Sequence, residues 1–169
     1  MKNILFKTIL IVNFLFILMS CKSQTTLNDY ITFYNGVSSK LNIIVPNKAQ
    51  FINQNFSNFY LELKNKNIII KNIGTSSKEA NSPKDYLLSL YFSDSDITNF
   101  VFNKNVFTYQ YPVVWITFQN EIPPEVNNVI RSYYGDWNEN VAQLFSNMKI
   151  EKIEFVGING YNNPDRSVK

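Results

Sequence analysis

The cysteine content constrains this chain more than any other single feature. Its 169 residues include one cysteine, Cys21. A single cysteine cannot form an intramolecular disulfide, so a folded domain must be held together by the packing of its side chains. The length allows this, because a chain of about 150 residues buries roughly two-thirds of the surface that it exposes when unfolded. Aromatic residues are abundant, and we expect some of the tyrosines to lie on a binding surface.

The residues before Cys21 have the pattern of an export signal. Lys2 and Lys7 flank a short basic start, and an almost wholly apolar run extends from Thr8 to Met19. A basic start, a core of about 7–15 apolar residues and a small residue before the cleavage site are typical of a secretory signal peptide. The run is shorter than the roughly 20 apolar residues that a membrane-spanning helix needs.

The end of this run, Leu18-Met19-Ser20-Cys21, resembles the lipobox of bacterial lipoproteins. The resemblance covers residues 1–21 only. It implies that residues 1–20 are a lipoprotein signal peptide that is removed, and that the sulfur of Cys21 receives a diacylglycerol. Residues 21–26 would then be the lipidated cysteine and a short polar tether. Two or three acyl chains anchor a domain stably, and the absence of Asp after Cys21 favours the outer membrane by analogy.

Two other interpretations of the first residues stay open. An uncleaved N-terminal helix with an incidental cysteine could span a bilayer if its flanking lysines reach the interfaces. A plain cleaved signal peptide would also explain the apolar run, although the only cysteine of the chain then stands at the lipobox position by chance.

The charge of the exported part gives no indication of a nucleic-acid partner. The chain has 16 basic and 13 acidic residues, and Lys2 and Lys7 are the only charged residues before Cys21. Residues 21–169 therefore carry 14 basic and 13 acidic groups, a net charge of +1. No block of basic residues is present, so we expect no binding to nucleic acid.

The absence of histidine narrows the possible chemistry further. Without histidine, Ser-His-Asp and Cys-His catalysis and histidine-based metal sites are excluded. The five glycines form no phosphate-binding loop, and the one thiol is expected to be acylated. We therefore expect no enzymatic activity, no cofactor and no metal site.

One acidic segment resembles the start of a calcium-binding loop. Asp94-Ser95-Asp96 is followed by Thr98, but the sixth position of such a loop would be Asn99 instead of Gly, and the twelfth Asn105 instead of Glu. We expect a polar turn here, with a weak, open oxygen site for a metal as the alternative.

In the first half of the exported part, we expect a mixture of helices and strands. Apolar spacing predicts a helix from Thr26 to Asn35, with Thr26 and Asp29 as its cap and Gly36 as its stop. The alternative is a β-hairpin that turns at Asn35-Gly36. Further elements are predicted as a strand (41–45), a helix (48–58), a β-hairpin (59–64 with 68–73) and a mobile polar loop (75–84).

The second half shows clearer patterns. Strands are predicted over 86–92, 106–111, 113–118 and 150–158. Pro123-Pro124 opens a helix that stops at Gly135, and Asp136 caps a second helix together with Glu139. Residues 159–169 are predicted to be a polar tail. The fold class is therefore α+β: a single domain over 27–158, with a mostly antiparallel sheet and packed helices, two of them near the C-terminus.

Two aromatic clusters are the candidate binding surface. One consists of Tyr133, Tyr134 and Trp137 around the turn between the last two helices, and the other of Tyr109 and Tyr111. Rings beside amide and carboxylate groups can stack on a sugar or grip a protein partner. In the alternative interpretation, Tyr133 and Trp137 belong to apolar helix faces and lie in the core.

The sequence thus favours a lipid-anchored cell-envelope protein that is a non-catalytic binding or assembly-supporting module. Its expected partners are the membrane, through acyl chains on Cys21, and a protein or glycan of the envelope. One alternative is a periplasmic inhibitor or immunity-type lipoprotein that neutralises a toxin or hydrolase. A second is a carboxylate-dependent glycan hydrolase, which needs two carboxylates about 5–10 Å apart across a cleft.

Overall fold

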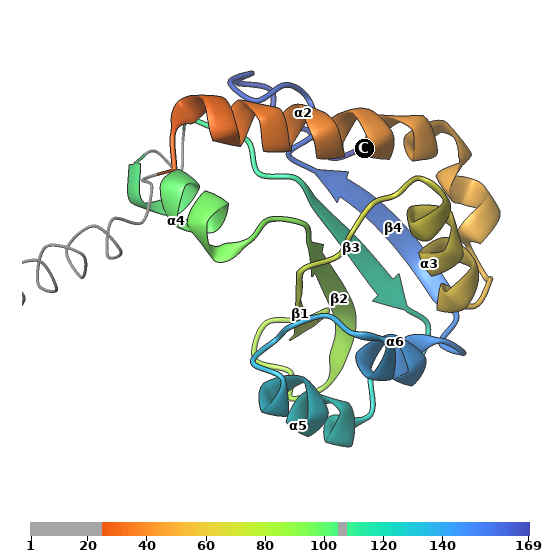
Figure 1. The fold of residues 1–169 in the computed structure, drawn as a ribbon. Helices are drawn as coiled ribbons and strands as arrows, with labels where there is room; N and C mark the ends of the chain where they lie inside the picture. Colours follow the sequence, from red (N-terminus) through yellow and green to blue (C-terminus); the bar gives the residue numbers. More distant parts are fainter. Residues whose placement is uncertain (1–24, 105–107) are drawn as a thin grey trace, which may run out of the picture.

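A computed structural model describes residues 25–104 and 108–169 of the chain (Figure 1). The predicted signal peptide and Cys21 lie outside the described residues. Four strands form one antiparallel sheet in the order β1 (Asn72–Ser77), β2 (Asp85–Tyr91), β3 (Val113–Phe118) and β4 (Ile150–Val156). The helices in the described part are α2 (Leu27–Ile44), η1 (Val45–Phe51), α3 (Phe56–Asn65), α4 (Ser95–Lys104), α5 (Pro124–Ser132) and α6 (Glu139–Phe145). The predicted α+β class is confirmed, as are two helices near the C-terminus.

Helix α2 is longer than predicted. Its start is the expected capping box, in which Thr26 Oγ1 accepts a hydrogen bond from Asp29 N–H (3.2 Å) and the Asp29 carboxylate accepts one from Thr26 N–H (2.8 Å). Gly36 does not stop the helix, and the predicted strand over 41–45 is wrong. The buried residues recur with helical spacing to the end of the helix: Tyr30, Tyr34, Ser38, Leu41 and Ile44.

The predicted β-hairpin of residues 59–64 with 68–73 is also wrong. Residues 59–64 belong to α3, where the buried positions are Phe56, Phe59 and Leu63 and the apolar Leu61 is exposed. The apparent alternation came from this exposed leucine. The first strand is instead β1, which pairs with β2, so the predicted loop over 75–84 shrinks to residues 78–84.

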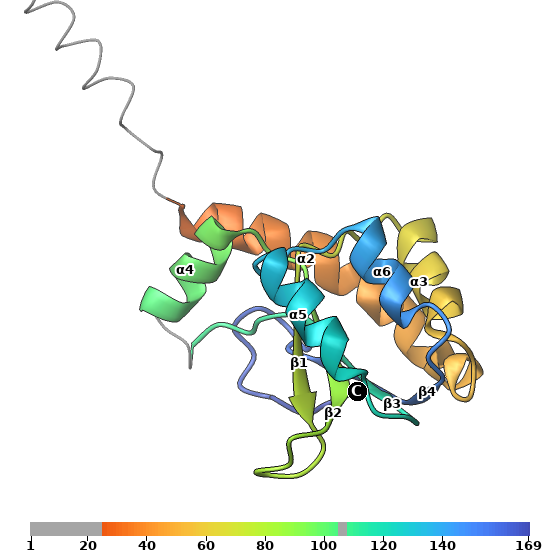
Figure 2. The ribbon, with the colours of Figure 1, turned by 90° about the horizontal axis from the view of Figure 1, so that it is seen from below.

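The strands β2, β3 and β4 form close to the residue ranges that the sequence predicted for them. Their inward residues are in register: Leu88 pairs with Ile116 and Ile116 with Ile153, while Leu90 lies opposite Val114. These side chains are buried against α2, α3, α5 and α6, which lie along one side of the sheet (Figure 2). Outward residues such as Trp115 and Glu154 stay partly exposed, as in antiparallel sheets with one open face.

The turn between α5 and α6 protects one edge of the sheet. Helix α5 begins at Pro124, as predicted, and the chain then turns at Tyr134 and Gly135. Ile73 N–H donates to the Gly135 carbonyl (2.9 Å), and Trp137 N–H donates to the Lys71 carbonyl (3.0 Å). These bonds cover the start of the free edge of β1, and an uncovered strand edge is a site for pairing with another chain. The N-cap of α6 is Asn138, not Asp136 as predicted.

A second, tyrosine-rich cluster lies between α2 and α4, with buried Tyr30, Tyr34, Ile97 and Val101 at its centre. Beside this cluster, the C-terminal segment is held against the domain. Gln110 is fully buried, and its side-chain amide donates to the carbonyls of Asn163 (2.8 Å) and Asp165 (2.5 Å) and accepts from Asn159 N–H (3.1 Å). The stretch predicted to be a polar tail is therefore fastened to the domain by a buried amide.

Residues 106 and 107 of the predicted strand over 106–111 lie outside the described residues, and residues 108–111 form no strand. None of the helices in the described ranges is long and apolar enough to cross a membrane.

Candidate ligand-binding pocket

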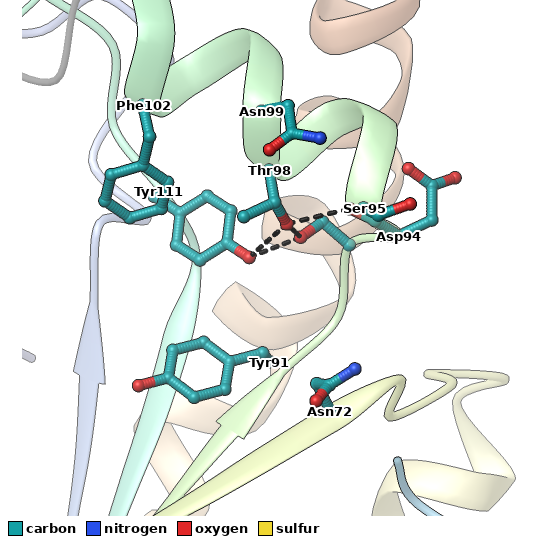
Figure 3. A pocket seen from close by; sticks show the side chains of 9 residues that line it. Asn72, Tyr91, Asp94, Ser95, Thr98, Asn99, Phe102 and Tyr111 are labelled. Atoms are coloured by element: carbon teal, nitrogen blue, oxygen red, sulfur yellow. Dashed lines mark hydrogen bonds between the residues drawn. The ribbon is translucent and has the colours of Figure 1, made fainter. Parts of the chain in front are cut away.

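A pocket of about 430 Å³ opens beside α4, at the end of the sheet where β1 begins and β2 ends (Figure 3). Asn72 and Tyr91 lie opposite each other in the β1–β2 register and form one wall. Alternation places both on the outer face of the sheet, because their neighbours Ile73 and Leu90 point into the core. The facing wall comes from the segment that enters α4, from α4 itself and from Tyr111.

Three aromatic rings line this pocket. Tyr111 contacts both of the others: its ring centroid lies 5.7 Å from that of Phe102, edge-on, and 6.2 Å from that of Tyr91, at a tilt of 39°. Phe102 is 54% exposed although it is apolar. The pocket therefore presents partly exposed apolar ring surface from three separate elements of the fold.

A short hydrogen-bond network fixes the Tyr111 hydroxyl. Thr98 Oγ1 donates to the Asp94 carbonyl (2.7 Å), so towards Ser93 (2.8 Å) and Tyr111 (3.1 Å) it can only accept. Ser93 Oγ and the Tyr111 hydroxyl also lie within hydrogen-bonding distance of each other. Because the Thr98 hydrogen is used on Asp94, Ser93 and Tyr111 share their two hydroxyl hydrogens among the three remaining contacts. Ser93 is buried, so this network joins the end of β2 to α4 without leaving its hydroxyl unpaired.

Asp94 ends this network at the first turn of α4. Its Oδ1 accepts from Ile97 N–H at 2.9 Å, which satisfies one of the free amides at the helix start. The predicted polar turn at residues 94–96 is therefore the start of a helix, which the sequence analysis missed. Within residues 25–104 and 108–169, no group of three or more Asp, Glu, Cys or His side chains is placed to hold a metal ion.

Other polar groups of the lining have no partner among the described residues. They are the Asn99 amide, the Ser95 hydroxyl and the Tyr91 hydroxyl. The Asn72 amide group donates to Asp136 Oδ1 at 3.1 Å, which ties the pocket wall to the α5–α6 turn. The pocket thus combines fixed hydroxyls with polar groups that are available to a ligand.

Gly157 positions the backbone of Tyr111. A Cβ atom at residue 157 would lie 2.2 Å from the Tyr111 carbonyl oxygen, and the φ angle of Gly157 is +68°. Only glycine allows this approach and adopts this backbone conformation without strain. The turn after β4 can therefore press closely against the segment that carries Tyr111 to the pocket.

The predicted cluster at the α5–α6 turn divides between core and surface. Trp137 is half-buried, packs edge-on against Tyr60 and donates from Nε1 to the Tyr60 hydroxyl (3.2 Å). Tyr133 is only partly exposed. Tyr134 is 92% exposed with a φ angle of 55°, a conformation that costs a non-glycine residue energy.

The second predicted pair stays together, because Tyr109 and Tyr111 both pack against the tyrosine-rich cluster. Tyr109 is half-buried in the tyrosine-rich cluster, where its ring lies 5.1 Å from that of Tyr30 and 6.0 Å from that of Phe100. Of the five aromatic residues proposed from the sequence, Tyr111 alone lines the pocket beside α4.

The sequence analysis did not select Tyr91, Asn72, Phe102 or Asn99. Tyr91 was assigned to a buried strand, and its outward direction could have been recognised only from the register of that strand. The segment 94–99 was predicted to be a polar turn, with a weak metal site as the alternative, and a helical pocket wall was not considered.

Fold and pocket together define an α+β domain with an antiparallel meander sheet, one helical layer and a ligand-sized pocket at the end of the sheet. No protein-family model, curated protein or solved structure matches this chain.

Proposed function

We propose that this chain is a lipid-anchored protein of the bacterial cell envelope whose domain binds a ligand in the pocket beside α4 without transforming it. The observation that carries the proposal is the lining of that pocket, in which aromatic rings and unpaired polar side chains accompany a single carboxylate, Asp94. Small-molecule sites typically combine an apolar surface with a few polar groups in a volume of roughly 300–1,000 Å³.

The anchoring rests on residues 1–21 and on where the fold begins. The capping box of α2 starts at Thr26, so a tether that begins at a lipidated Cys21 would consist of residues 21–26. Six extended residues span at most about 20 Å. A lipidated Cys21 would therefore hold the domain close to the lipid surface. Lys22 follows Cys21, so the analogy with bacterial lipoproteins favours the outer membrane.

The interactions that the carboxylates already make support a non-catalytic function. A glycan hydrolase needs two carboxylates across its cleft, whereas the lining of this pocket in the described part of the chain contains Asp94 alone, and one of its oxygens caps α4. Glu139 pairs with Lys64 at 3.1 Å, and Glu121 pairs with Lys84 at 3.3 Å. The hydrogen bonds from Lys64 and Tyr60 lower the pKa of Glu139, which favours a charged surface group over a general acid.

A second candidate function rests on Tyr134. This ring projects from a turn that is fixed on both sides: Gly135 N–H donates to the Ile130 carbonyl (3.0 Å), and Ile73 N–H donates to the Gly135 carbonyl. Exposed tyrosines on rigid segments are typical anchors of protein interfaces. An inhibitor or immunity-type lipoprotein could insert Tyr134 into the active site of its partner.

The anchoring is tested with Cys21→Ser in cells. We expect the wild-type protein to fractionate with membranes at its processed length, because acylation precedes cleavage in this class. The variant should keep its precursor length and leave the membrane fraction. If both proteins instead remain in the membrane at precursor length, an uncleaved helix holds the domain and the lipid-anchor proposal is wrong.

The two candidate functions are separated by purification in mild detergent. If the chain is an inhibitor, the wild type should retain one stoichiometric toxin or hydrolase and suppress its activity, and Tyr134→Ala should lose both properties. If the pocket is the functional site, Tyr134→Ala should behave as the wild type does.

A further inference from the structure

We propose that the ligand of the pocket beside α4 is a neutral saccharide. This inference rests on the proposed binding function and names the ligand class for that site. Three observations support it: the arrangement of the rings, the kind of polar groups and the charge of the lining.

The rings suit the flat, weakly polar C–H faces of a sugar. The face of an aromatic ring carries partial negative charge, which attracts the weakly positive C–H groups of a sugar ring. Tyr91 lies on the outer face of the sheet, while Phe102 projects from α4, with Tyr111 between them (Figure 3). A ligand in the pocket can therefore contact the Tyr91 ring while its edge reaches α4.

The polar groups suit hydroxyls, which both donate and accept. The Asn99 amide offers two N–H donors and a carbonyl acceptor, and the hydroxyls of Ser95 and Tyr91 can do either. None of the three has a partner among the described residues. Saccharide hydroxyls in the pocket could form hydrogen bonds with these groups without requiring any residue to change its charge.

The charge of the lining argues against an anion. No Lys or Arg belongs to the lining, and the second carboxylate oxygen of Asp94 has no hydrogen-bond partner in the described part of the chain. A phosphate or carboxylate group in this pocket would meet a negative charge and no cation. Nucleotides and acidic peptides are therefore disfavoured. A small organic cation is the main competitor, because aromatic faces and a carboxylate also attract ammonium groups.

The experiment uses the full chain in a polyoxyethylene detergent, which has no sugar or ammonium headgroup. Chitotetraose, maltotetraose and tetramethylammonium chloride are titrated separately by isothermal calorimetry. Saturation-transfer NMR reports which protons of the ligand touch the protein. We expect at least one tetrasaccharide to bind with its C–H protons against aromatic rings, and tetramethylammonium to bind more weakly or not at all.

Two variants locate the binding. Tyr91→Ala removes the ring and should raise the dissociation constant about tenfold, which is the loss of affinity expected for one stacked aromatic contact. Asn99→Ala removes an exposed side chain from a helix without disturbing the core, and it should weaken binding severalfold. Its matched control is Asn128→Ala, an exposed helical asparagine on α5 outside the pocket, which should bind as the wild type does.

Three results would overturn the inference: neither tetrasaccharide binds, tetramethylammonium binds in their place, or Asn99→Ala binds as tightly as Asn128→Ala. In the second case the binding function stands and the ligand class is wrong. If the NMR spectra show a tetrasaccharide being cleaved, the saccharide assignment stands and the non-catalytic function is wrong.

Discussion

At the scale of single residues, Gly157 and Gln110 hold the backbone that carries Tyr111 to the pocket. Gly157 lets the chain after β4 touch the Tyr111 backbone, and Gln110 fastens the C-terminal segment from the adjacent position. Both act on the stretch 109–111, which has no regular secondary structure. A close backbone contact and a buried amide therefore replace the strand hydrogen bonds that were expected to hold this stretch.

Gly157→Ala should destabilise the domain. The new methyl group would meet backbone atoms of Tyr111 at 2.2–2.9 Å, and the positive φ angle would become strained. Overpacking and backbone strain together typically cost roughly 2–4 kcal/mol. Urea unfolding followed by circular dichroism measures the change. An unchanged midpoint would mean that this backbone contact is looser than described.

At the scale of elements, the continuity of α2 is the main finding. The sequence analysis ended this helix at Gly36, because glycine is the usual residue after a helix and a β-branched run follows it. The structure continues the helix for two further turns, since Leu41 and Ile44 extend the buried stripe that begins at Tyr30. Burial of that stripe outweighs the low helix propensity of Gly36 and of the residues at 43–45.

Gly36→Ala should therefore stabilise the protein. No atom lies within 4 Å of the Cβ position, and the residue is exposed in the helix interior. Replacing glycine by alanine at such a site is worth roughly 0.5–1 kcal/mol. The same urea experiment gives the answer, and the variant is the matched control for Gly157→Ala. If Gly36 were a left-handed stop, alanine would lower the midpoint instead.

At the scale of the whole molecule, two clusters divide the interior. The larger one lies between the sheet and α2, α3, α5 and α6, while the tyrosine-rich one joins α2 to α4 and to the C-terminal segment. In the second cluster the Tyr30 hydroxyl donates to the Gln110 carbonyl (2.5 Å), and the Tyr34 hydroxyl accepts from Gly160 N–H (2.9 Å). The pocket is built where α4 meets the sheet, so its geometry depends on both clusters.

The stability of the protein should fall at alkaline pH. Burial is the first cause that raises the pKa of Tyr30 above its ordinary value of 10.0, followed by the neighbouring Tyr34, whose own pKa is also raised by burial. Above about pH 10 the unfolded chain loses these protons while the folded chain keeps them. Stability is therefore complete below pH 10 and decreases as the pH rises, by up to about 1.4 kcal/mol per pH unit for each tyrosine.

The double variant Tyr30→Phe/Tyr34→Phe tests this alkaline effect. It should be less stable than the wild type at pH 8, because the hydrogen bonds of both hydroxyls are lost, but its stability should decrease less steeply between pH 10 and 12. Urea unfolding at several pH values gives both slopes. Equal slopes would contradict the assignment of the effect to these two residues.

The sequence by itself determined those helices and strands whose local sequence pattern matches the secondary structure that they adopt in the folded protein. The strands β2, β3 and β4 form close to the ranges predicted for them, and the α5 helix begins at Pro124 and ends before Gly135, so the α+β class followed from local patterns. Tertiary structure alone decided the helical state of residues 41–45 and 59–64. A stripe of buried side chains, visible only after packing, overrode the β-branched run at 43–45 and the apparent period of two at 59–64. It also decided the pocket, since the register of β1 with β2 and the close approach of Gly157 bring Asn72, Tyr91 and Tyr111 together from distant parts of the chain.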